Sequence, residues 1–324
     1  MNKTIIIHEH GGPEVLRWEE KDPGRPGPGQ ALLRHTAIGL NFIDTYHRTG
    51  LYPLELPTSL GIEAAAVVEA VGPGVTDIQL GDRVAYAGGP PGAYSQTRII
   101  PAHLLVPLPA EIDDQAAAAV MIKGLTAQYL LRRTYRVEPG DTILVHAAAG
   151  GVGLLTCRWA SELGATVIGT VGNDRKAELA REHGCHHTIV YTRENFVERV
   201  KEITAGEGVP VVYDSVGKDT WDGSLDCLRP LGMMVSYGNA SGPVPAFEPA
   251  LLALKGSLFL TRPTLFSHIA TRETLLAAAD ELFAIMRSGT LKASVNQVFP
   301  LEDAADAHRA LEARQTTGAS VLLP

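Results

Sequence analysis

Cysteine is scarce in this chain of 324 residues, which holds only Cys157, Cys185 and Cys227. No two of them form a C-x-x-C pair, and an odd, widely spaced set does not build a disulfide framework. We therefore expect a protein of a reducing compartment, the cytoplasm.

Long apolar runs and an excess of positive charge are also missing. No run approaches the roughly 18 apolar residues of a membrane span, and the start, MNKTIIIHEHGG, lacks the apolar core of a signal peptide. The formal net charge is −8, without the basic stripe that nucleic-acid binding requires. We expect no membrane and no nucleic acid among its partners.

Short β-like runs separated by glycine and proline are abundant in residues 1–120. Examples are QALLRHTAIGL and DRVAYA, and punctuation is dense in KDPGRPGPGQ. This pattern is typical of a mostly antiparallel, partly barrel-like β domain. The run Ala116–Arg133, rich in Ala, Leu and Arg, predicts a helix that follows it.

From residue 142 strands and helices alternate. The predicted strands are TILVHAA, ATVIGTVG, HTIVY, VPVVYDSVG, GMMVSYGN and KGSLFLTRP. The predicted helices are residues 151–163, DRKAELAREHG, ENFVERVKEITAG and DTWDGSLDCLRPLG. Glycine is expected to end helices at Gly164, Gly184 and Gly206. The alternation predicts an α/β fold with a doubly wound parallel sheet.

The C-terminal piece predicts a helix over 271–289 and then a strand, a helix and a strand. It is too small to fold alone, so we expect it to rejoin the N-terminal β domain. The predicted domains are a split one, 1–121 with 262–324, and an inserted dinucleotide-binding one, 122–261.

The turn VHAAAGGVG carries most of a dinucleotide fingerprint, G-x-G-x-x-G, but has Ala148 at its first position. Gly150 allows a pyrophosphate to approach the backbone, and Gly153 allows the helix to pack closely on the strand. Ala148 is tolerable if its φ is not left-handed. Between a buried strand and a helix, the turn predicts a dinucleotide site.

The cofactor is indicated by the end of the second strand. No acid stands at Thr170–Gly172 to bind a ribose 2′-hydroxyl, and Arg175 and Lys176 follow, which favours NADP. Asp174 weakens this interpretation, although it is also suited to cap the next helix. The two cations also fit a solvated first helical turn.

Several segments in the same order resemble the zinc-free quinone oxidoreductases of the medium-chain dehydrogenase/reductase superfamily, which includes ζ-crystallin. They are HGGPEVL, AIGLNFIDTYHRTGLYP, GIEAAAVVEAVGPGV, GDRVAY, KGLTAQYLLRRTY, HAAAGGVG, VVYDSVG and TRPT. The resemblance, strongest to bacterial members, covers essentially the whole chain. It implies a GroES-like catalytic domain with an inserted Rossmann domain, NADPH as cofactor, a quinone substrate and a homodimer.

Comparison with the zinc-dependent relatives shows which ligands are missing. Asn41 and Ile62 stand where those relatives have cysteine and histidine, and neither side chain replaces a thiolate or an imidazole on zinc. Two other possible metal clusters, His8-Glu9-His10 on one face of a strand and Cys185-His186-His187, lack the rest of a site. We expect no metal, and hydride transfer from NADPH is the chemistry that remains.

The resemblance also implies where the site residues lie. Asn41, Tyr46 and Tyr52, in the loop that replaces the zinc-ligand region, are candidate catalytic residues because donors beside the quinone oxygens would suffice. Their alternative role is packing. The implied cofactor-binding residues are Asn41, Phe42, Ile43, Asp44, Thr45, Tyr46, Lys123, Tyr129, Gly150, Gly151, Val152, Gly153, Gly172, Asn173, Lys176, Tyr191, Ser215, Tyr237, Gly238, Asn239, Ala240, Thr261, Arg262, Pro263 and Arg314.

Some alternatives stay open. Lys123 is equally suited to brace the domain junction, and Asp44 to cap a local turn. The same hydride geometry serves an NADPH-dependent reductase of α,β-unsaturated carbonyls. A third possibility is an NADPH-binding structural or RNA-binding protein like some ζ-crystallin relatives, against which the acidic balance counts.

Overall fold

The structure, a computed structural model, describes residues 2–324 and divides them into two compact units. Residues up to Leu125 together with Ile269–Pro324 form the first, named the catalytic unit after the role that the sequence resemblance implies. Thr126–His268 form the second, named the cofactor unit on the same basis. Within residues 2–324 no helix is both long and apolar enough to cross a membrane.

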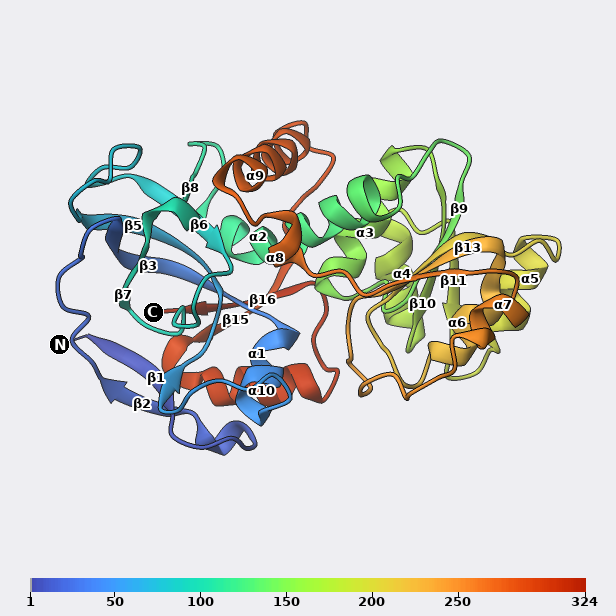
Figure 1. Cartoon of the computed structure of the whole chain (residues 1–324), viewed down its shortest axis with the longest axis horizontal. Helices are drawn as coiled ribbons and strands as arrows, with labels where there is room; N and C mark the ends of the chain where they lie inside the picture. The colour runs from blue at the N-terminus through green and yellow to red at the C-terminus, as the bar shows by residue number, and fades with distance from the viewer. Residues whose placement is uncertain (1) are drawn as a thin grey trace. The chain divides into compact units, whose positions relative to one another are not determined.

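The catalytic unit is built on two sheets (Figure 1). The smaller sheet has the order β2-β1-β4, and the larger has the order β15-β16-β3-β5-β6-β8 with β7 paired to β3. All pairings are antiparallel except that of β15 with β16. The strands are β1 (Lys3–Ile7), β2 (Arg17–Glu20), β3 (Gln30–Leu40), β4 (Thr58–Ser59), β5 (Glu63–Val71), β6 (Arg83–Ala87), β7 (Thr97–Pro101), β8 (Val106–Pro107), β15 (Val295–Pro300) and β16 (Ala319–Leu323).

The helices of the catalytic unit are α1 (Phe42–Thr49), α9 (Arg272–Arg287) and α10 (Ala304–Glu312), and α2 (Asp114–Tyr129) begins in it. Short 3₁₀ turns cover Pro13–Val15, Ala102–Leu104 and Leu301–Asp303. The C-terminal strand β16 pairs with β3, so the last segment does rejoin the N-terminal β domain, as predicted.

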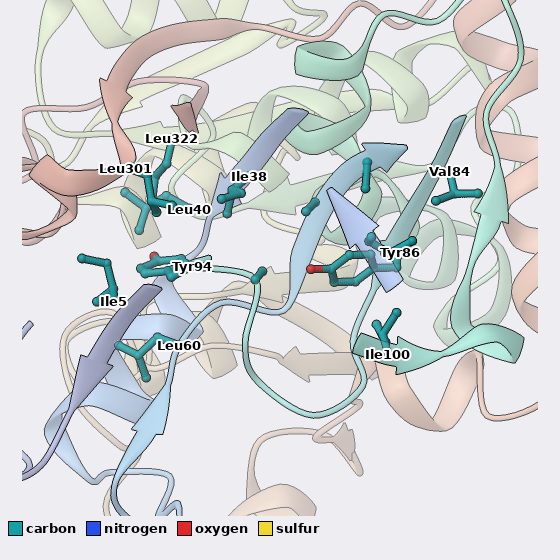
Figure 2. Close-up of a cluster of buried hydrophobic side chains, with 14 of the residues drawn as sticks. Ile5, Ile38, Leu40, Leu60, Val84, Tyr86, Tyr94, Ile100, Leu301 and Leu322 are labelled. Atoms are coloured by element: carbon teal, nitrogen blue, oxygen red, sulfur yellow. The ribbon is translucent and has the colours of Figure 1, made fainter. Parts of the chain in front are cut away.

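One apolar core fills the catalytic unit. Figure 2 shows Tyr94 among Ile5, Leu40 and Leu60, side chains that are all at most 2% exposed. Burying side chains of this size contributes roughly 1.5–3 kcal/mol each. The hydroxyl groups of Tyr86 and Tyr94 lie inside this apolar core, so each requires a hydrogen-bond partner.

The cofactor unit contains one parallel sheet of six strands in the order β11-β10-β9-β12-β13-β14. Numbered within the unit this is the order 3-2-1-4-5-6 of a Rossmann fold, confirming the predicted fold class. The strands are β9 (Thr142–Val145), β10 (Thr166–Val171), β11 (His187–Val190), β12 (Val209–Asp214), β13 (Leu228–Ser236) and β14 (Phe259–Thr261). The helices are α3 (Gly151–Glu162), α4 (Asp174–Glu182), α5 (Phe196–Ile203), α6 (Trp221–Cys227), α7 (Ala250–Leu254) and α8 (Leu265–His268).

Glycines end the helices of this unit as predicted. Gly164, Gly184 and Gly206 have φ of 87°, 92° and 88°, the left-handed region that glycine enters without steric cost. Gly169 of β10 serves close packing instead. A Cβ there would overlap both the sulfur of Cys185 and the methyl group of Ala148.

Local structure differs from the sequence prediction in four places. α2 ends at Tyr129 and a π-helical turn, Leu130–Thr134, follows it. The helix predicted over 219–232 is wrong beyond Cys227, because β13 already begins at Leu228 and pairs with β12 there. β1 ends at Ile7, so residues 8–10 do not share a strand face. The predicted loop at 42–49 is the helix α1.

Candidate active site

The turn after β9 forms a cradle at the start of α3. Ala147 takes the left-handed conformation, with φ of 52°, while Ala148 avoids it and donates its N–H to Thr170 O at 3.0 Å. Ala148 is fully buried. The missing first glycine is therefore accommodated, because the strained position is one residue earlier.

Glycine is required in this turn mainly at residue 153. A Cβ on Gly153 would overlap the backbone of Ala147 and Ala148, whereas one on Gly150 would only touch Ala147 O at 3.2 Å. Gly150 is the N-cap, and the first amides of α3, from Gly151 and Val152, have no acceptor inside a helix. This geometry fits a phosphate at the positive end of the helix dipole.

The ends of β10 and β11 lie side by side, because these strands pair in parallel from Ile168 to Val171. Gly172 has little space for a side chain, since a Cβ there would lie 3.1 Å from the Tyr191 hydroxyl oxygen. Asn173 is the N-cap of α4 and accepts the Lys176 N–H at 3.0 Å. The suggestion that Asp174 caps this helix is thus wrong.

The ends of β12, β13 and β14 are joined into one edge. Tyr237 N donates to Asp214 O, and Ala240 N donates to Ser215 O at 3.1 Å. One Arg262 nitrogen donates to the Ser236 carbonyl and hydroxyl and to Gly238 O at 2.9 Å. The predicted segments Ser215, Tyr237–Ala240 and Thr261–Pro263 therefore lie together, at the carboxyl edge where doubly wound sheets bind ligands.

Tyr129 lies at the end of α2 and belongs to the cofactor unit. Its ring is 3% exposed and stacks on His268, with ring centroids 4.5 Å apart and planes 7° from parallel. Burial raises the pKa of its hydroxyl, while Arg262 lowers it.

Sequence reasoning missed a buried chain of polar groups beneath this edge. His146, after β9, bonds to Thr170 Oγ1 at 2.8 Å and to Ser224 Oγ at 3.0 Å. Ser224 donates to Asp214 Oδ2 at 2.8 Å, and the other oxygen of Asp214 accepts the amides of Val216 and Gly217. These bonds hold the turns after three neighbouring strands in place. Burial, the largest effect, lowers the pKa of His146.

In the catalytic unit, Glu63 of β5 is fully buried and satisfied by three donors. These are Asn41 Nδ2 at 2.7 Å, the Ile122 amide at 2.5 Å and Lys123 Nζ at 3.0 Å. Lys123 is 6% exposed. An acid in the otherwise apolar strand GIEAAAVV was a signal of such a partner, because a buried charge must be paired.

Asn41 and Asp44 together start α1. Asp44 Oδ2 accepts the Asn41 N–H at 2.9 Å, so Asp44 does cap the turn. Helix α1 carries Phe42, Ile43, Thr45 and Tyr46. Tyr46 packs between Phe42 and Tyr52, with ring centroids 5.8 and 5.2 Å away. Tyr46 and Tyr52 are thus brought together, whereas Asn41 lies at the N-cap of α1 and its amide nitrogen is turned inward to Glu63.

A second buried network leads from Asp44 to the surface. Tyr94 donates to Asp44 Oδ2 at 3.1 Å and bonds to His308 Nε2 at 3.0 Å. Arg48 donates to His308 Nδ1 at 2.9 Å and pairs with Glu312 at 2.6 and 3.1 Å. Because an arginine only donates, the proton of the neutral imidazole is on Nε2. Arg314, exposed, follows α10 with a φ of 57°.

Burial dominates the acid–base properties of this network. It raises the pKa of Asp44 to about 7 and lowers that of His308 to about 3, helped at His308 by Arg48. The Asp44 Oδ1 atom is buried with no hydrogen-bond partner. A neutral carboxyl is therefore the favoured form below neutrality.

Replacing Asp44 with asparagine is expected to change how stability depends on pH. Between the ordinary value of 3.8 and about 7, folded Asp44 holds a proton that the unfolded chain has lost, so its contribution to stability falls as pH rises. The unfolding free energy of D44N relative to the parent should thus increase by at most about 1.4 kcal/mol per pH unit in this window.

Denaturant unfolding at several pH values measures this difference. The charged and titratable groups around Asp44, namely Tyr94, Lys123, Glu63, His308 and Arg48, are unchanged in both proteins and cancel to first order. A difference that does not vary between pH 4 and 7 would contradict the raised pKa.

The two possible metal clusters have other partners. His8 bonds to Glu19 at 2.8 Å, and His10 faces Arg48 O at 3.3 Å. The Cys185 sulfur is 3.3 Å from that of Cys157, and the His186 ring accepts the Val167 N–H. Across residues 2–324 no three His, Cys, Asp or Glu side chains are grouped to hold a metal ion.

Comparison with known proteins agrees with this architecture. Residues 27–110 match the family described as the alcohol dehydrogenase GroES-like domain, and residues 151–281 match the zinc-binding dehydrogenase family. A quinone oxidoreductase of Pseudomonas aeruginosa is 56% identical, with all of both chains covered. A 2-haloacrylate reductase of a Burkholderia species is 53% identical over all of this chain and 99% of its own.

Solved structures agree as well. The Escherichia coli quinone oxidoreductase complexed with NADPH superimposes with a TM-score of 0.98 at 51% identity, covering 99% of this chain and 100% of that one. A 2-haloacrylate reductase gives a TM-score of 0.89 at 52% identity, with 99% of each chain covered. The chain therefore belongs to the quinone oxidoreductase family of the medium-chain dehydrogenase/reductase superfamily.

Proposed function

We propose that this protein is an NADPH-dependent quinone reductase that transfers hydride to a quinone without a metal. The observation that carries the proposal is full-length identity of 51–56% to several proteins named quinone oxidoreductase. The replacement of the zinc ligands by Asn41 and Ile62 supports the metal-free route.

The cofactor unit has the features that NADPH needs. The first turn of α3 would hold the pyrophosphate, since Gly153 leaves no side chain between helix and turn. When bound, NADPH supplies the hydride. The residues proposed to hold it are Asn41–Tyr46, Lys123, Tyr129, Gly150–Gly153, Gly172, Asn173, Lys176, Tyr191, Ser215, Tyr237–Ala240, Thr261–Pro263 and Arg314.

Tyr46 in α1 and Tyr52 shortly after α1 are the proposed donors to the quinone oxygens. Tyr46 and Tyr52 pack edge to face, which fixes both rings and suits contact with a flat substrate. Asn41 has a supporting role in this proposal, because Glu63 engages its amide nitrogen. Lys123, besides its proposed contact with NADPH, also binds Glu63.

Reduction of an activated C=C bond is the second candidate. The similarity to 2-haloacrylate reductase, at 53% identity, favours it specifically. A haloacrylate carries a carboxylate that a simple quinone lacks, so a carboxylate-bearing alkene tests this candidate better than a neutral enone.

Steady-state assays distinguish the two candidates. The purified protein is expected to oxidise NADPH with 1,2- or 1,4-quinones and much more slowly with 2-chloroacrylate or a neutral enone. Turnover of the alkenes alone would refute the quinone proposal. Binding of NADPH without turnover of any acceptor would favour a binding protein instead.

The working form is proposed to be a cytoplasmic homodimer. Strand β14 ends the parallel sheet, and Phe259 on it and Leu254 just before it are 57% and 85% exposed, which suits a second copy on this edge. Light scattering of the purified protein would reveal a monomer if this is wrong. The three buried, unpaired thiols support a reducing compartment.

We also propose that residues 1–121 and 262–324 serve as the catalytic domain and 122–261 as the cofactor domain. The two compact units, which divide after Leu125 and after His268, support this assignment. No nucleic-acid partner is proposed, since the net charge is −8.

A further inference from the structure

Asp174 is the one feature of the cofactor unit that argues against NADPH. It is the first residue of α4, directly after Gly172 and Asn173, at the end of the second strand of the Rossmann fold. An acid in this region serves NAD, because its oxygens accept hydrogen bonds from the ribose 2′-hydroxyl. The same charge would repel a 2′-phosphate.

Arg193 removes this conflict. Its two terminal nitrogens donate to the two oxygens of Asp174, at 2.7 and 2.5 Å, so each carboxylate oxygen accepts one bond. This paired geometry is the strong form of an arginine–carboxylate contact. Arg193 follows β11 by three residues, two beyond Tyr191, so the pair joins the turns after two neighbouring strands.

Other charges nearby are also accounted for. Glu194 accepts the Val190 N–H at 2.8 Å and pairs with Arg199 at 3.3 Å. Arg181, which lowers the pKa of Asp174 less than Arg193 does, donates to Thr188 Oγ1 at 3.1 Å. With Asp174 neutralised, Arg175 and Lys176 leave the start of α4 positive.

We propose that Arg193 determines specificity for the phosphorylated cofactor by neutralising Asp174 and occupying both of its oxygens. This role rests on the proposed NADPH-dependent function and is indirect, through Asp174. The pair is exposed, with side chains 57% and 67% accessible, so its effect is moderate and sensitive to salt.

Binding of two cofactor fragments tests the proposal without turnover. Adenosine 2′,5′-bisphosphate carries the 2′-phosphate, and 5′-AMP lacks it. By calorimetry at low ionic strength, R193A should weaken the bisphosphate about fivefold to tenfold, with the effect reduced in high salt. Binding of 5′-AMP should stay within about twofold, since it has no 2′-phosphate for the uncovered Asp174 carboxylate to repel.

The decisive comparison is a double-mutant cycle with Asp174→Ala. In the D174A background, R193A should change bisphosphate binding by less than about twofold, because no carboxylate is left to neutralise. Arg136→Ala removes another exposed arginine–carboxylate pair of the same unit, that of Arg136 with Glu138 at 3.1 Å, and should change neither fragment's affinity.

Three results would overturn the proposal. They are an equal loss for both fragments in R193A, no loss for either, or the same loss whether or not Asp174 is present, which would mean that Arg193 contacts the phosphate directly. If quinone turnover is absent while the cycle behaves as expected, the proposed reaction is wrong and this specificity role stands.

Discussion

Replacing Lys176 with alanine is expected to raise the dissociation constant for NADPH roughly 10- to 100-fold, since a hydrogen bond to a charged group contributes about 1.5–3 kcal/mol. The Kd for NADH should change by less than about twofold, because NADH has no 2′-phosphate for the Lys176 ammonium to bind. Lys176 lies in the first turn of α4, where Asn173 Oδ1 holds its backbone N–H at 3.0 Å. Fluorescence titration of both nucleotides measures the ratio.

Lys201 provides the matched control for Lys176. It is an exposed lysine in α5 of the same unit, and its removal should affect neither nucleotide. Equal weakening of NADPH and NADH by K176A would show that Lys176 does not recognise the 2′-phosphate.

Replacing Lys123 with methionine is expected to destabilise the catalytic unit by about 3–5 kcal/mol, since it leaves a buried charge without its partner. Glu63 is fully buried, and the Lys123 ammonium is 3.0 Å from it. The two amide donors from Asn41 and Ile122 remain but do not neutralise the carboxylate. Calorimetric unfolding would show the loss as a lower transition temperature.

Two further variants separate charge from packing at Lys123. K123M with Glu63→Gln should recover much of the loss, because a neutral amide no longer requires a cation. Lys3→Met breaks an exposed pair with Glu20, 3.8 Å long, and should cost less than about 1 kcal/mol. The role assigned to the buried pair would be wrong if K123M cost no more than K3M.

The sequence was sufficient to predict elements whose signals are local. The alternation of strands and helices predicted the parallel sheet. The helix ends at Gly164, Gly184 and Gly206 could also be predicted, because a left-handed φ depends on the type of a single residue. Asn41 and Ile62 were also found from the sequence, through the resemblance to zinc-dependent relatives, and the metal-free route that they favour stays a prediction.

What could not be predicted depended on contacts between distant residues. The pairing of Glu63 with Lys123, the bridge from His146 to Asp214, and Arg193 on Asp174 all join separate elements. Helix α1 was missed because the short segment FIDTYHRT contains β-branched and aromatic residues of low helix propensity. Its start is stabilised by Asp44, itself held by Tyr94.

Gly169 and Ala148 share the space of a single methyl group between strand and turn. The Ala148 methyl group occupies the space that a Cβ on Gly169 would need, so the residue types at these two positions constrain each other. We expect relatives with glycine at position 148 to tolerate alanine at position 169 when the residue at position 185 is smaller than cysteine. The dinucleotide fingerprint of this chain therefore consists of two segments, the turn that holds Ala148 and the strand that holds Gly169.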